Sequence, residues 1–265
     1  MATQFTNYTK DGLLNHYFRN TQWSNSGRNS IQVGLHTADP TAAGSDAALL
    51  TGIGKVSTSF GSATAGGIAN DASITFSTTS SGDDGAVITH IAVYGNDGQM
   101  LCYGDATPNL TVSEGTDIVI PVAGLAVGVD TNSLGTPLNV NYAFTDARVV
   151  EFLDFVIGLG TVPAAPSAHY FCYVDTFDKD GSGSAWAGMN EAIAFDAPVA
   201  GTGTARKVQN TSAVDYVTTG AQSLGMWVVK DQAYSPIALK QLSGNAVVSG
   251  ATVTMNANDL EVYVD

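Results

Sequence analysis

Two segments of the chain carry the apolar spacing of a short amphipathic helix. In the first, Leu13, Leu14, Tyr17 and Phe18 recur at i, i+1, i+4 and i+5, which places them on one helical face. We expect each helix to pack on a sheet as a lid. The second segment has its inward positions at Val149, Val150, Leu153, Val156 and Ile157. The candidate caps are Thr6, Asn7 or Thr9 and then Asn20 for the first helix, and Thr145 or Asp146 and then Gly158 for the second.

The rest of the chain is a series of short apolar runs separated by turn residues, which predicts strands. Asn96-Asp97-Gly98 stands between two of these runs, and it favours a tight hairpin because these residues tolerate positive φ. About six strands and one helix in each half predict an antiparallel β-sandwich. The predicted strands are 31–36, 55–60, 74–77, 87–95, 100–106 and 117–125, then 169–175, 192–195, 223–229, 237–242 and 252–255.

The order of these elements occurs twice, which indicates an internal duplication. At an offset of 135 residues Val93 lies over Val228 and Gly115 over Gly250. Near the starts the offset grows to 139, where Phe5-Thr6-Asn7 lies over Phe144-Thr145-Asp146. We therefore predict a mainly β protein of two tandem sandwich domains, residues 1–130 and 131–265, each opening with its amphipathic helix. Each half is long enough to bury its own core.

One connector and two low-complexity loops lie between the predicted strands. Residues 130–141 contain Asn, Gly and Pro but no charge run, so we expect a short ordered connector. Residues 61–70 and 197–204 occupy similar places in the two halves. They fit either exposed arms that order against a neighbour or mobile loops.

Charge and cysteine content limit the partners. The formal net charge of −14 divides evenly into −7 on each side of Asp130, so acidity is a property of both halves. Such a surface repels phosphate backbones, and direct nucleic-acid binding is not expected. Cys102 and Cys172 lie in apolar runs, which favours buried free thiols over a disulfide. No stretch resembles a signal peptide or a membrane span, so we expect synthesis in the cytoplasm without secretion by a signal peptide.

Motifs of catalysis and cofactor binding are missing from the sequence. The Gly-x-Gly starts at Gly52, Gly158, Gly181 and Gly201 all lack the last glycine of a dinucleotide fingerprint. There is no nucleophile elbow, zinc-protease motif or Cys-x-x-Cys. His16, His36, His90 and His169 form no close pair in the sequence, and we interpret His36 and His90 as structural. We predict that the protein is not an enzyme and has no cofactor, apart from the Ca²⁺ considered next.

One loop has the spacing of a cation site. Asp178, Asp180 and Ser182 put oxygen ligands at alternate positions beside Gly181 and Gly183, as in a calcium loop. Met189 occupies the position where an EF-hand has a bidentate Glu, so an ordinary turn fits the loop as well.

Tryptophans are the candidates for contact with a partner. Trp23 and Trp186 fall in predicted loops and are assigned to protein–protein contact, with a sugar platform as the alternative. Trp227 lies within a predicted strand and belongs to the core or an interface.

A series of short motifs in the first half resembles a known family. The first motif is Thr6-Asn7-Tyr8, before the helix, and the second is Leu35-His36-Thr37-Ala38-Asp39-Pro40-Thr41, at the end of a strand. The third is Ile-Thr-His-Ile-Ala-Val-Tyr at 88–94, and the fourth is Leu101-Cys102-Tyr103-Gly104. Over most of residues 1–125 the chain is similar to small structural proteins of tailed bacteriophages that are often labelled tail-fibre or virion proteins. The second half has Val174-Asp175-Thr176-Phe177-Asp178 where Ala-Asp-Pro-Thr is expected.

The resemblance implies a structural protein of the virion, made in the host cytoplasm. The chain has no heptads, collagen triplets or short periodic repeat that would build a shaft. We therefore expect a capsid decoration or cement protein, with a tail component (adaptor or fibre-associated protein) or a glycan-binding adhesin as alternatives. Its expected partners are other virion proteins, the major capsid or tail proteins, and no membrane. A homotrimer would present six similar domains and suit a sixfold surface.

Overall fold

In the computed structural model the regular structure of the described residues is mainly antiparallel β-strand, with two helices, which confirms the predicted fold class. The residues that the structure describes are 3–21, 23, 31–63, 67–78, 82–128, 143–144, 146–157, 164–177, 183–185, 190–201, 205–223, 225–242 and 246–264. The predicted connector at 130–141 lies outside them.

The first half contains one helix and nine strands among its described residues. A five-stranded sheet has the order β1-β7-β6-β2-β3, and the pairs β4–β9 and β5–β8 form two separate two-stranded sheets. The elements are β1 (Thr3–Phe5), α1 (Asn7–Phe18), β2 (Ile31–His36), β3 (Val56–Thr58), β4 (Ile68–Ala69), β5 (Ile74–Phe76), β6 (Val87–Tyr94), β7 (Met100–Thr111), β8 (Ile118–Ile120) and β9 (Ala126–Val127).

The second half has a similar arrangement. Its main sheet has the order β10-β19-β18-β11-β12, with β13 also paired to β11, and the smaller sheets are β14-β15-β22, β16–β21 and β17–β20. The elements are β10 (Ala143–Phe144), α2 (Asp146–Ile157), β11 (His169–Phe177), β12 (Gly183–Ala185), β13 (Glu191–Ile193), β14 (Val199–Ala200), β15 (Arg206–Gln209), β16 (Val214–Val217), β17 (Gln222–Ser223), β18 (Met226–Lys230), β19 (Pro236–Gln241), β20 (Ala246–Val247), β21 (Thr252–Met255) and β22 (Glu261–Val264).

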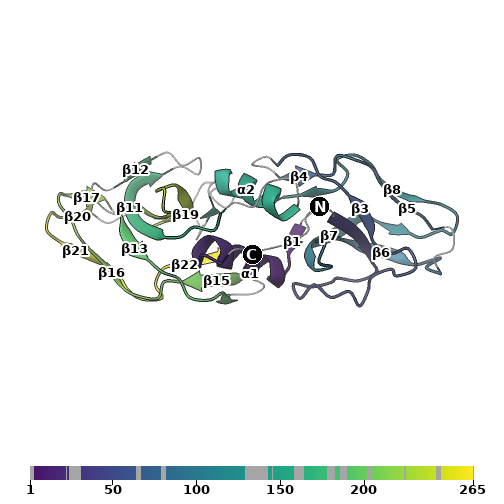
Figure 1. Cartoon of the computed structure of the whole chain (residues 1–265), viewed down its shortest axis with the longest axis horizontal. Coiled ribbons are helices and arrows are strands. Elements are labelled where there is room, and N and C mark those ends of the chain that lie inside the picture. The colour runs from purple at the N-terminus through teal and green to yellow at the C-terminus, as the bar shows by residue number, and fades with distance from the viewer. Residues whose placement is uncertain are drawn as a thin grey trace.

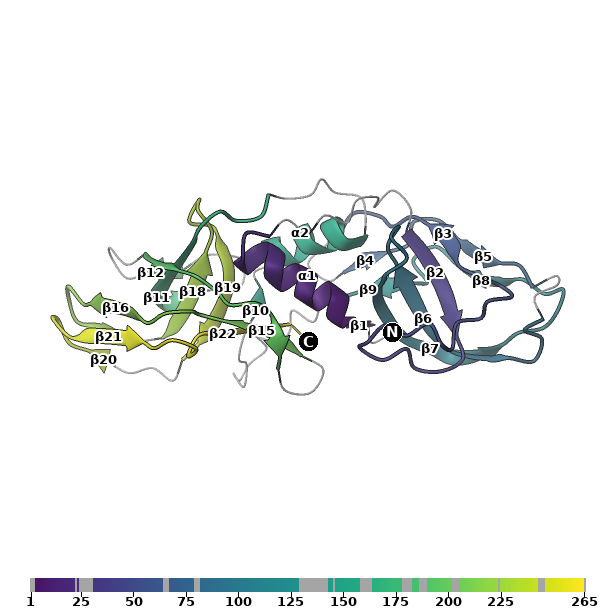
Figure 2. The same cartoon turned by 60° about the horizontal axis from the view of Figure 1, so that its bottom comes forward.

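Each described sheet takes its strands from one side of residue 130, and the helices lie between the two sets of sheets. Figure 1 shows an elongated molecule with sheets at both ends and α1 and α2 in the middle, and the turned view in Figure 2 agrees. Both chain ends also lie in the central region (Figure 1). No described helix is long and apolar enough to cross a membrane.

The helix and the hairpin that were predicted in the first half are present, and their cap and turn residues act as the sequence indicated. Thr6 caps α1, since its hydroxyl oxygen accepts the Thr9 N–H at 3.4 Å. Asn20 follows the helix in the left-handed conformation with φ 49°. Gly98 closes the β6–β7 hairpin with φ 78°, as the Asn-Asp-Gly sequence predicted. Cys102 and Cys172 are buried free thiols, also as predicted.

Several strands were not predicted. They include β15, β16 and β22 of the second half, and β7 continues to Thr111, five residues beyond its predicted end. In β15 only Val208 is buried, so the strand has too few apolar residues to show a period of two. The short strands β1, β4, β9, β10, β12, β14 and β20 were missed as well.

Two buried asparagines make the same set of hydrogen bonds in the two halves. The Asn70 amide donates to the carbonyls of Ala72 and Pro121, and its oxygen accepts the Leu125 N–H. The Asn210 amide donates to the carbonyls of Ser212 and Asn256, and its oxygen accepts the Leu260 N–H. Asn70 is 1% exposed and Asn210 is fully buried. Each asparagine thus fastens two separate segments of its own half.

Two buried threonines, Thr78 and Thr218, show the same correspondence between the halves. Thr78 Oγ1 donates to the carbonyls of Ser113 and Thr116, and Thr218 Oγ1 donates to those of Val248 and Ala251. The turns that they hold contain Gly115 and Gly250 at φ 78° and 80°. The strand registers agree as well, because Ile68 faces Val127 while Val208 faces Val262.

The apolar core continues through both halves. Among the described residues, one cluster of buried side chains includes α1, α2 and strands from the sheets at either end. A smaller cluster of Ala92, Tyr94, Met100 and Tyr103 occupies the other face of the β2-β6-β7 sheet. The central helices are therefore part of the core of both halves.

Candidate functional site

The first helix extends into the second half. The Phe18 ring packs edge-on against Phe195 with centroids 5.0 Å apart, and the Tyr17 carbonyl lies within hydrogen-bonding distance of His169 Nε2. Arg206 on β15 donates two hydrogen bonds to Asp11, at 2.5 and 2.9 Å. The start of α1 stays on its own sheet, where Thr9 Oγ1 donates to the Leu101 carbonyl at 2.7 Å. The helix therefore bridges the two halves.

The second helix makes the reciprocal contacts. Phe155 of α2 lies 5.0 Å from the His16 ring and 5.3 Å from Trp23, measured between centroids. Phe152 of α2 packs edge-on against Phe5 of β1 at 5.3 Å. The Asp154 carboxylate accepts the Ala63 N–H at 2.8 Å. We call the contacts made by α1 and α2 across the two halves the helix junction.

The helix junction also orders the described ends of both low-complexity loops. Ala63 bonds to α2, and the Pro198 carbonyl accepts a hydrogen bond from Arg206, which holds Asp11 of α1. Ala63 thus contacts a helix of the other half directly, whereas Pro198 is linked to α1 only through Arg206 of its own half. The centres of both loops, 64–66 and 202–204, lie outside the described residues.

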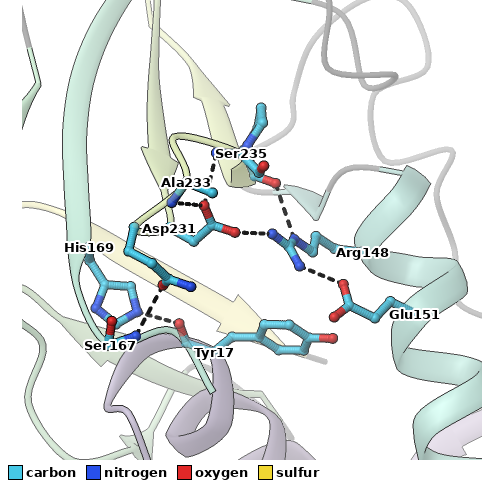
Figure 3. A network of polar contacts seen from close by, with 10 residues as sticks. Tyr17, Arg148, Glu151, Ser167, His169, Asp231, Ala233 and Ser235 are labelled. Carbon is cyan, nitrogen blue, oxygen red and sulfur yellow. Dashed lines mark hydrogen bonds and ion pairs between the residues drawn. The ribbon is translucent and has the colours of Figure 1, made fainter. Parts of the chain in front are cut away.

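Beside the junction, Arg148 of α2 organises a polar network (Figure 3). Its guanidinium forms ion pairs with Glu151 and Asp231 and donates to the Pro236 carbonyl at 3.4 Å. The other Asp231 oxygen accepts the N–H groups of Ala233 and Ser235, at 2.8 and 2.9 Å. Burial alone would lower the pKa of Arg148, but the two carboxylates outweigh it and raise that pKa. The network fastens the β18–β19 hairpin to α2.

A second network lies under the loop that follows β2. His36 Nε2 is 2.7 Å from the Tyr94 hydroxyl, which donates to Asp46 at 2.7 Å. Lys55 pairs with Asp46 at 3.1 Å and lies 3.4 Å from the centroid of the Tyr94 ring. Burial lowers the pKa of His36 and so favours the neutral ring. His36 and Tyr94 are fully buried, whereas the Asp46 side chain is exposed, so the network ties two buried rings to the loop that follows β2.

Three of the segments behind the phage resemblance meet around the start of α1, while the 88–94 motif forms strand β6. Thr6 Oγ1 donates to the Met100 carbonyl at 2.6 Å, and the Asn7 N–H donates to the Ala42 carbonyl at 2.8 Å. The Asp39 carboxylate accepts the Thr41 N–H at 2.7 Å and fixes the intervening turn. The motif residues therefore have structural roles: they attach the start of α1 to the neighbouring loop and strand, and they fix the turn after β2.

Comparison with known families agrees with the predicted resemblance to phage structural proteins. Residues 4–128, just under half of the chain, match the family described as podophage GP4 fiber I protein gp80. Over these residues the chain is similar to a phage fibre protein. The match supports the predicted resemblance to structural proteins of phage virions. No curated protein matches the chain.

Most of the predicted site residues lie outside the described part of the chain. Asp178, Asp180, Ser182 and Trp186 all do, so the calcium loop and the contact by Trp186 stay predictions. Among the described residues there is no group of three or more His, Cys, Asp or Glu side chains that could hold a metal ion.

The two described tryptophans pack inside the molecule. Trp23 is half-buried and covers Gly12 of α1, where an added Cβ would lie 2.5 Å from the indole ring. Its ring also contacts Tyr8 and Phe155, so it contributes to the helix junction. Whether it also contacts a partner stays a prediction. Trp227 is 1% exposed and lies in the core.

The two strand histidines face each other, although they are far apart in the sequence. The β2–β6 register makes His36 and His90 direct partners. His90 bonds to Thr89 Oγ1 at 2.8 Å and to Asp105 at 3.1 Å. Both rings thus have side-chain partners of their own, as expected of structural histidines.

Sequence reasoning missed a pair of tyrosines in the second half, of which Tyr234 is exposed and Tyr170 is partly buried. Tyr234 in the β18–β19 hairpin is 53% exposed, and its ring lies 4.9 Å from that of Tyr170 on β11. Tyr234 has φ 60°, a conformation that costs a residue with a Cβ about 1–2 kcal/mol. An aromatic pair returns about 0.5–1.5 kcal/mol. Stability alone therefore gives little reason for a tyrosine at this position.

Proposed function

We propose that the chain is a non-enzymatic structural component of a tailed-phage virion, associated with a fibre. The match of residues 4–128 to a podophage fibre family carries the proposal. The matched family, one of phage fibre proteins, favours the tail-component alternative over capsid decoration. Its partners would be other virion proteins.

We further propose that the chain is an internal duplication joined into one elongated unit. The support is the set of matched hydrogen bonds at Asn70 and Asn210, and at Thr78 and Thr218, together with equal strand registers. The reciprocal contacts of α1 and α2 hold the halves in one orientation (Figure 2). An elongated two-ended unit suits a spacer or connector between virion parts.

Capsid decoration is the second candidate. It is favoured by compact antiparallel sheets without the short periodic repeat of a shaft. Three chains would present six similar halves, which fits a sixfold arrangement in either location.

Quantitative mass spectrometry of purified virions tests these proposals. Copy number is measured against the major capsid protein. A fibre-associated component gives about six to a few dozen copies, whereas decoration of the capsid lattice gives on the order of hundreds, because symmetry multiplies each site. Absence from purified particles would overturn both assignments.

A further inference from the structure

We propose that the outer end of the second half is the surface through which two copies of this chain contact each other. We call this surface, formed by the turns at 217–223 and 246–252, the second-half tip. The strands that lead to it, β16, β20 and β21, lie at the end of the molecule away from α1 and α2 (Figure 1, Figure 2). The surface lies outside residues 4–128, which match the fibre family, and the inference does not depend on where the protein lies in a virion.

Matched hydrogen bonds show which residues of the two halves correspond at this end. In the first half, Thr78 Oγ1 donates to the Ser113 carbonyl at 2.9 Å. In the second half, Thr218 Oγ1 donates to the Val248 carbonyl at 2.6 Å. The glycine two residues after each carbonyl has a similar positive φ, 78° and 80°. The two turns therefore share a backbone conformation, and the side chains at equal positions can be compared.

The side chains at equal positions differ in polarity. Val248 is 69% exposed and stands where the first half has Ser113. Val217, directly before Thr218, is 58% exposed and stands where the first half has Ser77. Because the first half builds the same turn with serines, the fold does not require valine at either position. Exposed apolar side chains gathered on one uncharged surface are typical of a contact site.

The two ends of the molecule also differ in charge. Residues 217–229 and 241–258 contain no Asp, Glu, Lys or Arg. The corresponding turn of the first half carries two exposed acids, Glu114 and Asp117, where the second half has a serine and a threonine. The second-half tip is thus uncharged in a chain whose formal net charge is −14.

The missing charge indicates that the partner is a second copy of the chain. Two copies, each with a net charge of −14, repel each other wherever their acidic surfaces meet. A basic partner would be attracted by acids at the tip, whereas a second copy can approach closely only where they are absent. Contact through the ends of two elongated molecules also keeps their other charges apart, and salt screens repulsion beyond about 8–10 Å. Pairing of identical surfaces about a twofold axis is the commonest form of oligomer.

Sedimentation velocity of the purified full chain measures this contact. A surface of two short turns supports a weak contact, so protein concentrations up to about 0.5 mM are used. The average mass should rise with concentration toward that of two chains. Added salt should strengthen the association, because it screens the repulsion between the two acidic chains and leaves the apolar contact. A single-chain mass at every concentration would overturn the proposal, and so would an association that salt weakens.

Two variants place residues of the first half on the same turn of the second. Val248→Ser should weaken the association about tenfold or more, because both copies lose an apolar side chain from the contact. Ser249→Glu combined with Thr252→Asp restores the acids of the first half, so it should abolish the association at low ionic strength and regain part of it in salt. Val119→Ser, which removes a valine 55% exposed on β8 of the first half, is the matched control and should associate like the wild type.

Thermal midpoints separate a lost contact from a lost fold. Both tip variants replace exposed residues by those that the first half has in the same turn, so their midpoints at low protein concentration should stay within about 3 °C of the wild type. Association that survives in both tip variants would overturn the proposal, because the contact would then lie elsewhere. Loss of association in Val119→Ser, with the fold unchanged, would overturn it as well. Since the purified chain suffices, a negative result here leaves the copy-number test of the proposed function unaffected.

Discussion

Replacing Phe155 by alanine tests whether the helix junction couples the two halves. Phe155 is 1% exposed on α2, and its ring contacts His16 and Trp23 of the first half. Truncating a buried phenylalanine costs about 3–5 kcal/mol, through lost burial and the cavity left behind. We take about 4 kcal/mol as the expected loss in the free energy of unfolding. That value corresponds to about a thousandfold in the unfolding equilibrium.

Amide hydrogen exchange read by mass spectrometry measures this loss separately in each half. The reporters are β6 in the first half and β18 in the second, two central strands of the main sheets. If the junction makes the molecule one cooperative unit, Phe155→Ala accelerates exchange in both strands by the same factor of about a thousand. Val119→Ala, at an exposed site, should leave both unchanged. Acceleration confined to β18 would refute the coupling and favour two independent domains.

Three further predictions concern buried polar groups and thiols. Asn70→Ala and Asn210→Ala should each lower the free energy of unfolding by about 2–3 kcal/mol, because each leaves buried backbone groups unpaired. Denaturant titrations measure both losses, and unequal losses would argue against equivalent roles for the two asparagines. Burial lowers the pKa of His169 below its usual 6.5, so the unfolded state binds the proton more readily and stability falls as pH drops below about 6.5. His169→Gln should make thermal midpoints less dependent on pH between about pH 7 and about pH 5, and an unchanged slope would contradict this assignment. Burial raises the pKa of Cys102 to about 12, so a thiol reagent should modify it only after unfolding, and rapid labelling of the native protein would contradict the burial.

Elements with strong local signals were predictable from the sequence. The apolar face of α1 and its Thr6 cap fix the helix, and Asn-Asp-Gly fixes the β6–β7 hairpin. Strand β15 was missed because Arg206-Lys207-Val208-Gln209 has a single apolar residue, and the strand is held instead by pairing with β22.

The helix junction and the tyrosine pair carried no such signal. An apolar helix face shows that a surface is buried, but it does not show which sheet buries it. The contact of Phe18 with Phe195 joins residues 177 positions apart and depends on the tertiary arrangement. The turn at Tyr234 contains no glycine, so the rules that identified Gly98 could not identify its counterpart.

Cutting the chain between its halves tests directly whether the helix contacts hold the halves together. A protease recognition site inserted between residues 131 and 142 allows cleavage after folding, and size-exclusion chromatography then reports whether the fragments stay together. The reciprocal helix contacts predict that both fragments elute together at the volume of the intact chain and separate only in denaturant. Two separate, folded fragments in native buffer would contradict the claim that the helices join the halves into one unit.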